Sequence, residues 1–263
     1  MNLNEYTAMY RLEDTYWWFV ARRRLVAQLL RERQISALAE ILDVGCGTGA
    51  TLELLQRFGR ATGVDSHLPA LEICSLERGV PVQQAQAEEL PFPDHSFDVV
   101  TCLDVLEHTD DDIVALREIH RVCAPEAIFI AMVPAYGFLW SEHDEALKHR
   151  RRYTAHELRN KMTSAGFDVV SSTYFITLLF FPILAVRLWQ GLFKKNIYPQ
   201  TAIRELPAWL NRFFVGLLDI ERFLTRFLNL PFGVSLVVVG TPAQQFGDHP
   251  LTERLGDELM IEA

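Results

Sequence analysis

The sequence predicts a layered α/β protein, in which helices pack against a β-sheet. Three observations lead to this fold class. Short apolar runs rich in β-branched residues recur along the chain, helix-like apolar spacings separate them, and glycine, proline or acidic residues stand at most boundaries. The chain has 263 residues, of which 49% are apolar and 22% charged, so it is long enough for one domain with an insertion.

The expected strands are short and apolar. The run at 41–44 leads into a glycine-rich turn, and the run at 61–64 ends at Asp65. The other candidates have a similar length and are bounded by turn-forming residues. The expected strands span residues 41–44, 61–64, 80–84, 97–103, 127–133, 167–174 and 233–240.

The expected helices show apolar spacing and end signals. Three acids, Asp110 to Asp112, precede a helix whose positive N-terminal end they would stabilise. Thr154 and Glu157 have the spacing of a capping box, and Gly79 and Gly166 would each end a helix. The expected helices span residues 15–33, 50–58 and 68–78, with two more running to 122 and to 165.

We expect a single domain over residues 1–263. Its expected parts are an N-terminal helical lid at 1–37, a core at 38–175 and 233–242, an apolar helical insertion at 176–232 and a tail at 243–263. The longest apolar run, 174–186, is shorter than the roughly 20 residues that a membrane-spanning helix needs, and it contains Pro182.

Charge and the N-terminal composition narrow the function classes. The formal net charge is −9, which disfavours a nucleic-acid substrate because an acidic surface repels phosphates. The polar, acidic start has no basic segment followed by an apolar one, so we expect no signal peptide and a cytoplasmic protein.

A glycine-rich turn, Gly45-Cys46-Gly47-Thr48-Gly49, follows the first strand and would let a ligand approach the backbone closely. A dinucleotide loop prefers G-x-G-x-x-G; Ala50 stands at the third glycine position, and spacing alone does not exclude this alternative. However, Asp43 is poorly placed for a pyrophosphate and well placed for a cationic amino group. A P-loop is excluded, because no Gly-Lys-Ser/Thr ending follows.

An acidic residue ends the second strand. Asp65 comes 16 residues after Gly49, where a carboxylate can accept both hydroxyls of a ribose. A strand-end turn aspartate is the alternative, and the glycine loop upstream favours ribose. The two features together predict a nucleoside site.

Four motifs in order carry a family resemblance: ILDVGCGTG at 41–49, GVD at 63–65, AEELPFPDHSFDVV at 87–100 and LDVLEH at 103–108. They resemble class I S-adenosylmethionine-dependent methyltransferases of the small-molecule, ubiquinone-biosynthesis-like type. The resemblance covers roughly residues 38–135. It implies S-adenosylmethionine as cofactor and a Rossmann-like, doubly wound, seven-stranded sheet with the last strand antiparallel, here preceded by the apolar insertion.

The resemblance also implies roles for single residues. The methionine moiety would lie along the glycine loop, with Asp43 near its amino group, and Asp65 would hold the ribose. The adenine would lie beside Ser66 and the 86–88 loop, where the family often has Asp at the position of Gln86, and Leu103 would close over the cofactor. The cofactor residues implied are Asp43, Gly45, Cys46, Gly47, Gly49, Asp65, Ser66, Gln86, Ala87, Glu88 and Leu103.

Catalytic candidates follow from the chemistry of methyl transfer. The enzyme mainly positions the acceptor and excludes water, and a hydroxyl or acidic-carbon acceptor usually needs a general base. His108 follows the fourth strand, and His143 lies with Asp144 and His149 after the fifth, where the acceptor should bind. Tyr153 ends an H-x-R-R-Y stretch and completes the candidate set of His108, His143 and Tyr153. The spacing matches no standard metal site, so we predict none.

Aromatic and basic clusters add further expectations. Residues 16–18 (YWW) would form a lid over the site, with an ordinary amphipathic helix as the alternative. Arg22 or Arg23 would pair with the cofactor carboxylate, and the arginines at 150–152 would bind an acidic acceptor, with a solvated charge run as the alternative.

The apolar insertion leaves three interpretations open. It could cap a hydrophobic acceptor pocket, lie in a membrane interface, or form a homodimer surface. We favour a cap over a hydrophobic or lipid-linked acceptor that is O- or C-methylated, with contact to the inner membrane face as a further possibility. The other function classes left open are an NAD-dependent oxidoreductase and a non-catalytic, membrane-associated nucleoside-binding protein.

Overall fold

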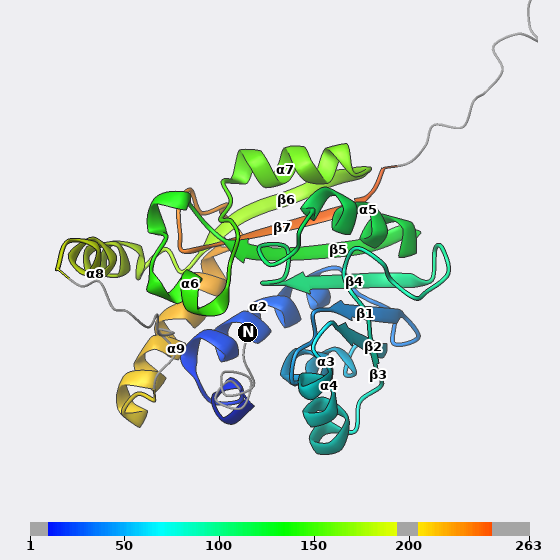
Figure 1. Ribbon diagram of the computed structural model, residues 1–263, viewed down its shortest axis with the longest axis horizontal. Helices are drawn as coiled ribbons and strands as arrows, with labels where there is room; N and C mark the ends of the chain where they lie inside the picture. Colours follow the sequence, from blue (N-terminus) through cyan, green and yellow to red (C-terminus); the bar gives the residue numbers. More distant parts are fainter. Residues whose placement is uncertain (1–9, 194–204, 244–263) are drawn as a thin grey trace, which may run out of the picture.

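A computed structural model of the chain describes residues 10–193 and 205–243. Its centre is one seven-stranded sheet in the order β3-β2-β1-β4-β5-β7-β6 (Figure 1). The strands are β1 (Glu40–Val44), β2 (Arg60–Asp65), β3 (Val82–Gln84), β4 (Phe97–Leu103), β5 (Cys123–Pro134), β6 (Phe167–Phe175) and β7 (Ser235–Pro242). β7 runs antiparallel to both of its neighbours and the other pairs are parallel, which confirms the predicted fold class.

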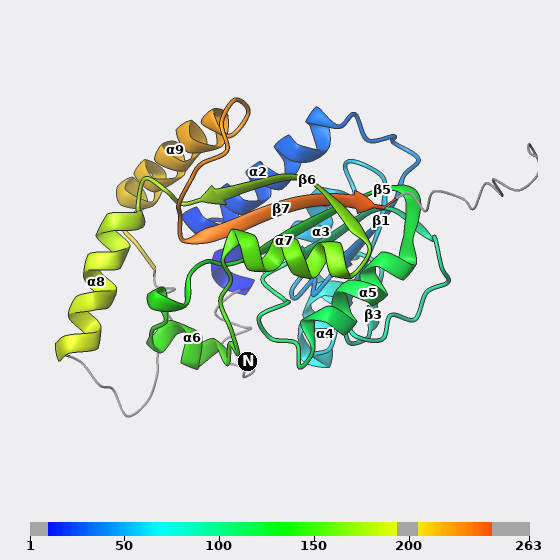
Figure 2. The ribbon, with the colours of Figure 1, turned by 90° about the horizontal axis from the view of Figure 1, so that it is seen from above.

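Helices cover both faces of the sheet, as Figure 2 shows for α5 and α7 on one side and α2 and α9 on the other. The helices are α2 (Trp17–Glu32), α3 (Ala50–Leu55), α4 (Leu68–Ile73), α5 (Asp112–Val122), α6 (Glu142–Leu147), α7 (Ala155–Ser164), α8 (Phe180–Phe193) and α9 (Ala208–Leu224). Alternate residues of β4 enter the two cores: Val100 packs with the α5 and α7 side chains, and Val99 with those of α2 and α3.

The predicted N-cap residues act as expected, although among the described residues only the Thr154 half of the predicted capping box forms. The carboxylate of Asp111 accepts hydrogen bonds from the backbone N–H groups of Ile113 (2.9 Å) and Val114 (3.2 Å) at the start of α5. The hydroxyl of Thr154 accepts from Glu157 N (3.2 Å) at the start of α7. Two differences appear elsewhere. The helix predicted at 68–78 becomes a π-helical turn from Cys74, and the short helix α6 was not expected.

The predicted insertion contains two helices, α8 and α9, while residues 194–204 lie outside the described part. Helix α9 packs along α2. Asn211 accepts a hydrogen bond from Trp17 N (2.8 Å) and donates to Thr15 O (2.7 Å). The buried Glu221 accepts from the backbone N–H groups of Thr177 and Leu178 (both 2.9 Å). Among the described residues no helix is long and apolar enough to cross a membrane.

Candidate active site

A cavity of about 1060 Å³ lies at the carboxyl ends of the parallel strands. In Figure 1 the arrowheads of β4 and β5 point toward α6 and the start of α2, which close this end of the sheet. Residues after β1, β2, β4 and β5 form the floor, and side chains from α2, α6, α8 and α9 form the walls. Open α/β sheets bind their ligands at this edge, where the loops after the strands converge.

The glycine loop lies directly against the end of β2. The N–H groups of Gly45 and Cys46 donate to Val64 O (2.7 and 2.9 Å), and Gly47 N donates to Asp65 Oδ2 (2.9 Å). Gly45 has a positive φ of 75°, and a Cβ on it would lie 2.1 Å from Cγ2 of Val105. Gly47 has a φ of 55° and open space where its Cβ would be. The loop therefore presents bare backbone to the cavity.

Gly49 and Asp43 do not line this cavity, which corrects two of the expected contacts. Gly49 has a φ of 91°, and a Cβ there would lie 2.4 Å from Cys74 Sγ, so glycine is needed to start α3. Asp43 is buried behind the loop, where its carboxylate accepts a hydrogen bond from Thr101 Oγ1 (2.6 Å). Burial raises the pKa of Asp43 to about 6, against the opposing effect of that hydrogen bond. Both residues support the loop instead of forming the cavity wall.

The remaining expected cofactor residues all line the cavity. They are Gly45, Cys46, Gly47, Asp65, Ser66, Gln86, Ala87, Glu88 and Leu103. Asp65 is almost buried, and its second oxygen accepts from His67 N (2.8 Å), which fixes the carboxylate. Burial raises the pKa of Asp65 despite the hydrogen bonds from His67 and Gly47. Glu88 accepts from Asp110 N (3.0 Å), so this loop is tied to the segment after β4.

The N-terminal segment covers the glycine loop through contacts that spacing did not predict. The buried carboxylate of Glu13 accepts hydrogen bonds from Thr48 Oγ1 and Arg78 Nη2, both at 2.7 Å. Arg22 pairs with Asp104 (2.7 Å) and stacks on the ring of Trp18. Tyr16, Trp17 and Trp18 line the cavity, as a lid would, whereas the apolar side of α2 packs on the sheet.

The arginines expected to bind charged ligands are already engaged. Arg22 pairs with Asp104, and Arg23 donates to Glu13 O (2.5 Å). Among the arginines at 150–152, Arg150 pairs with Asp110, Arg151 with Asp112 and Arg152 with Asp144. The solvated-charge alternative does not describe Arg152, which is buried, and Arg22 and Arg152 both line the cavity.

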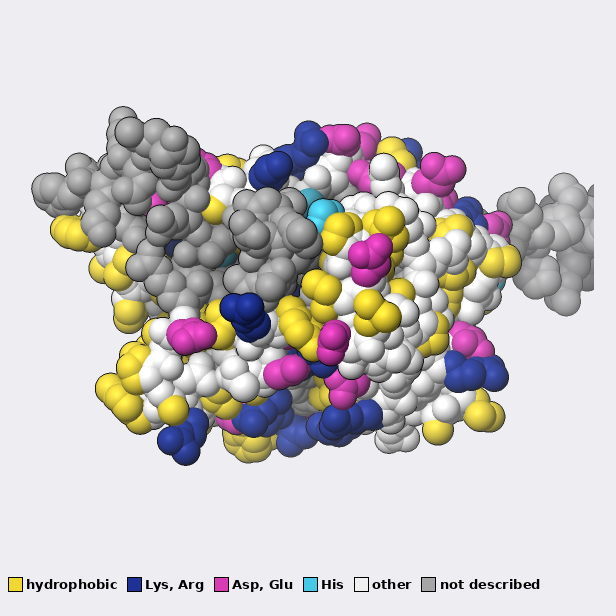
Figure 3. Space-filling view, turned by 60° about the horizontal axis from the view of Figure 1, so that its bottom comes forward, with side chains coloured by type: hydrophobic (Ala, Val, Ile, Leu, Met, Phe, Trp, Pro, Cys, Tyr) yellow, Lys and Arg dark blue, Asp and Glu magenta, His cyan; other side chains and the backbone are white. Residues whose placement is uncertain are grey.

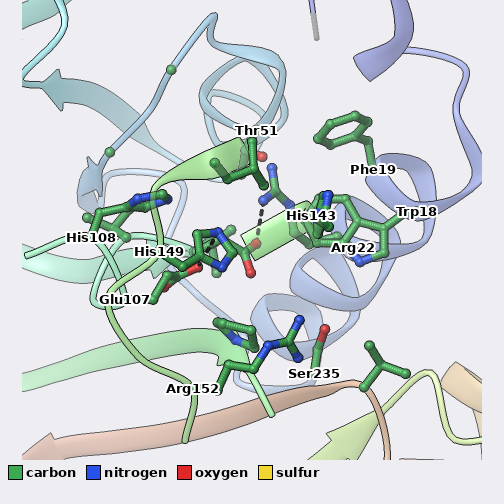
Figure 4. Close-up of a pocket in the computed structure, with 18 of the residues that line it drawn as sticks. Trp18, Phe19, Arg22, Thr51, Glu107, His108, His143, His149, Arg152 and Ser235 are labelled. Atoms are coloured by element: carbon green, nitrogen blue, oxygen red, sulfur yellow. Dashed lines mark hydrogen bonds and ion pairs between the residues drawn. The ribbon is translucent and has the colours of Figure 1, made fainter. Parts of the chain in front are cut away.

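A polar cluster occupies the cavity wall between β4 and α6 (Figure 4). The ring centroids of His108 and His149 are 4.8 Å apart, and those of His143 and His149 are 6.2 Å apart. Nδ1 of His149 lies 2.9 Å from Oδ1 of Asp144. Glu107 is fully buried in this wall; neither of its carboxylate oxygens has a hydrogen-bond partner among the described residues, and His149 Nε2 lies 4.0 Å away.

Burial controls the protonation of this cluster. Burial lowers the pKa of His108 to about 4 and that of His143 to about 3, so both imidazoles are neutral near pH 7. Burial raises the pKa of Glu107 well above its usual range. Burial would also raise the pKa of Asp144, but the hydrogen bond from His149 and the charge of Arg152 hold it well below its usual range.

A metal ion is not required by this arrangement. Glu107, His108 and His149 do bring three ligand-type atoms within 4.8 Å of one another, a grouping that sequence spacing could not predict. Burial, however, raises the pKa of Glu107 well above its usual range, which favours the neutral carboxyl, a poor metal ligand. The other two buried carboxylates nearby are already paired, Asp104 with Arg22 and Asp144 with Arg152 and Arg187. We therefore treat the cluster as a hydrogen-bonding one.

Tyr153, expected to be catalytic, lies outside the cavity. It is fully buried, and its hydroxyl donates to Asp112 Oδ2 (2.8 Å) and lies 3.1 Å from Leu106 O. The contact joins α5 to the loop after β4. The correction has a physical reason. Which side chains are buried depends on packing between distant segments, and the H-x-R-R-Y pattern carries no information about that packing.

The far end of the cavity is apolar. Side chains from the start of the insertion and from α8 and α9 form this wall. They are Ile176, Leu179, Pro182, Ile183, Val186 and Phe214. One cavity thus joins a nucleoside-type cradle, a polar cluster and an apolar wall.

A seven-stranded sheet with an antiparallel β7, a glycine loop after β1 and an acid at the end of β2 are the features expected of a class I S-adenosylmethionine-dependent methyltransferase fold. Residues 42–131 match the family model of the methyltransferase domain. The chain is 30% identical over 161 residues to a probable S-adenosylmethionine-dependent methyltransferase of Mycolicibacterium smegmatis, covering 60% of this chain and 61% of that protein. It is 39% identical over 104 residues to the ubiquinone biosynthesis O-methyltransferase of Pseudomonas entomophila, covering 36% and 44%.

Solved structures agree on the fold. An S-adenosylmethionine-dependent methyltransferase of Thermotoga maritima superposes with a TM-score of 0.57 at 20% identity, over 91% of this chain and 96% of that one. The [4+2]-cyclase SpnF superposes equally well, with a TM-score of 0.57 at 21% identity over 87% of each chain. The family match ends at residue 131, so it contains Glu107 and His108 but stops before His143, His149 and the apolar wall. The chain spans about 61% or less of the length of these curated relatives. The NAD-dependent alternative is not favoured by these matches.

Proposed function

We propose that the protein transfers a methyl group from S-adenosylmethionine to a small apolar or lipid-linked acceptor, by O- or C-methylation. One observation carries the proposal: the cavity that contains the glycine loop and Asp65 also contains the apolar wall from α8 and α9. A volume of about 1060 Å³ is at the upper end of ordinary ligand pockets and leaves room for an acceptor beside a nucleoside.

The residues on the nucleoside side fit the cofactor. The backbone of Gly45 and Gly47 would lie along the methionine moiety, since no side chain stands between it and the cavity. Asp65 retains free lone pairs on a fixed carboxylate and would accept the ribose hydroxyls. Ser66 and the 86–88 loop would face the adenine. The bound cofactor supplies the electrophilic methyl group.

The outer surfaces of α8 and α9 support a lipid-linked acceptor. They expose large apolar side chains, among them Phe181, Trp189, Trp209, Phe213 and Phe223. Figure 3 shows yellow side chains gathered at the end of the molecule where these helices lie, with basic side chains along the adjoining edge. Because the same helices line the cavity with their inner faces, we propose peripheral contact with the inner membrane face, where an apolar acceptor would enter.

The test of acceptor class uses methyl-labelled S-adenosylmethionine and a detergent-dispersed bacterial lipid extract. We expect label in the apolar fraction, and we expect Ile183→Asp in the apolar wall to remove it while S-adenosylhomocysteine still binds. Val170→Asp, at an exposed position on β6, is the matched control and should keep activity. Labelling only of water-soluble compounds would refute an apolar acceptor.

Membrane contact has a separate test. Wild type should float with vesicles of phosphatidylglycerol and phosphatidylcholine in a density gradient, and Phe181→Ser/Trp209→Ser should float less. If wild type stays in the aqueous fractions, membrane contact is refuted. If light scattering shows a dimer whose formation depends on Trp209, the helices cover another copy of the chain instead of a bilayer.

A further inference from the structure

His149 is held in one orientation at the cavity wall. Its Nδ1 lies 2.9 Å from Asp144 Oδ1, and its side chain is only 6% exposed yet lines the cavity. An ionised carboxylate can only accept, so the proton of this hydrogen bond belongs to Nδ1. The neutral ring then carries its lone pair on Nε2, the nitrogen 4.0 Å from Glu107 Oε1.

Asp144 is fixed and kept ionised by its other partners. Arg152 donates to both carboxylate oxygens (Nε 2.7 Å, Nη2 3.1 Å), and Arg187 lies 3.4 Å away. The Ser141 backbone N–H donates to Oδ2 at 2.9 Å, which closes the capping box of α6. A carboxylate with this many donors does not take a proton from the imidazole. It orients the ring, as the acid of a catalytic triad does.

We propose that His149 is the general base of this site, with Nε2 accepting the proton of an acceptor hydroxyl and with Asp144 as its positioning residue. The inference rests on the proposed function and narrows its acceptor to an apolar molecule that carries a hydroxyl. The hydroxyl oxygen forms its bond to the methyl carbon as the carbon–sulfur bond breaks, and that bond's electron pair stays on sulfur. The hydroxyl proton passes to Nε2, so the positive charge of the sulfonium ends on the imidazolium.

The other two imidazoles of the cluster are weaker candidates. His108 hydrogen-bonds the Lys148 backbone, and its pKa of about 4 makes its lone pair a poor proton acceptor near pH 7. His143 has a pKa of about 3 for the same reason, with the charge of Arg187 lowering it further. The Nδ1 of His149, by contrast, is fixed by its hydrogen bond to the Asp144 carboxylate.

Charged and titratable groups surround His149. The groups that face it are Asp104, Glu107 and His108 after β4, His143 and Asp144 on α6, Arg152 after α6, Arg187 on α8 and Arg22 on α2. Arg22 is paired with Asp104, while Arg152 and Arg187 are paired with Asp144. Glu107 pairs with none of these described arginines; its Oε1 lies 4.0 Å from Nε2 of His149, and burial raises its pKa, which favours a neutral carboxyl beside the ring.

The direct test needs no acceptor. Nitrogen NMR of histidine-labelled protein with S-adenosylhomocysteine, at pH 8, should show His149 protonated at Nδ1 and bare at Nε2, with the signal assigned by its absence in His149→Gln. A ring protonated at Nε2 and bare at Nδ1 would overturn the proposal. Loss of activity to a chelator with recovery on adding a divalent cation would also overturn it, because Nε2 would then be a ligand.

Kinetics supply the second test. The acceptor is 4-dodecylphenol, and its methyl ether, which has no free hydroxyl, is the negative control. His149→Gln should lower kcat by about 10²–10⁴-fold, the usual contribution of a general base, while S-adenosylhomocysteine affinity stays within about threefold. His156→Gln, an exposed histidine on α7, is the matched control and should match wild type. An active wild type with an equally active His149→Gln would refute the role of His149, whereas a wild type that labels neither this phenol nor a lipid extract would refute the proposed function.

Two conservative variants test the positioning role of Asp144. Asp144 is ionised, and removing its charge makes the imidazolium less stable, so the rising limb of kcat against pH should move to lower pH by about one unit in Asp144→Asn. Burial favours the neutral form of Glu107, so Glu107→Gln should leave the limb in place and is the matched comparison. An unshifted limb in a folded Asp144→Asn would contradict the charge argument, and if that variant does not fold, His149→Gln carries the test.

Discussion

Replacing the first glycine of the loop should reduce stability, and a second substitution should partly restore it. In Gly45→Ala the new Cβ would lie 2.1 Å from Cγ2 of Val105, far inside van der Waals contact, at a φ of 75°. A non-glycine residue in this left-handed conformation costs about 1–2 kcal/mol. Overpacking a filled site typically costs about 1–3 kcal/mol. We therefore expect the free energy of unfolding to fall by roughly 2–5 kcal/mol, or Tm by roughly 4–20 °C.

The assay is chemical denaturation together with calorimetric binding of S-adenosylhomocysteine. Adding Val105→Ala removes the clashing methyl groups but leaves Val105 Cβ at 3.3 Å and the backbone strain unchanged, so it should return only part of the loss. Gly47→Ala is the matched comparison, since its Cβ meets nothing within 4 Å. It should cost only the backbone term, about 1–2 kcal/mol, yet weaken binding because its methyl group enters the cavity. Unchanged stability in Gly45→Ala, or no recovery in the double variant, would refute the steric reasoning.

Three further predictions concern buried polar groups. Asp65→Asn should weaken S-adenosylhomocysteine binding about 10–100-fold in calorimetry through loss of charged hydrogen bonds; unchanged affinity would rule Asp65 out as the ribose acceptor. Tyr153→Phe should lower the free energy of unfolding by about 1–2 kcal/mol by removing its bond to Asp112, and kcat should stay unchanged; a stable variant with much lower kcat would return Tyr153 to the catalytic set. Burial raises the pKa of Asp43 from 3.8 to about 6, so its contribution to stability is full below about pH 4 and is lost as pH rises through about 6. Wild type should therefore lose about 3 kcal/mol relative to Asp43→Asn between pH 4 and 7 in urea denaturation, and parallel pH profiles would contradict this.

The cofactor side of the site was largely predictable because its signals are local. The glycines after β1 and the acid after β2 stand at the ends of strands whose apolar pattern can be recognised in a few residues, and parallel strands bring their carboxyl ends together. The differences from expectation there concern which residues of the loop face the cavity. Asp43 and Gly49 lie in the same short segment as the lining glycines, but one carboxylate turns toward Thr101 and one Cα packs against Cys74.

The acceptor side was less predictable because its contacts join distant segments. The same holds for the cover over the glycine loop, where the hydrogen bond between Glu13 and Thr48 links residues 35 positions apart and no spacing rule connects them. His149 was recognised only as part of a histidine-rich stretch, since its proximity to Glu107 depends on how the segment after α6 returns to the end of β4. Glu107 belongs to a recognised motif, yet its burial without a hydrogen-bond partner appears only in the packed molecule.

By itself, the sequence determined the sheet, its covering helices and the nucleoside cradle, because periodicity, turn residues and strand-end acids are properties of neighbouring residues. Only the tertiary structure decided which polar groups face the cavity, because burial and hydrogen bonding are set by packing between segments far apart in the chain. The composition of the apolar insertion predicted helices. Its use as a cavity wall became evident only when α8 and α9 were seen to meet the end of the sheet where Asp65 lies.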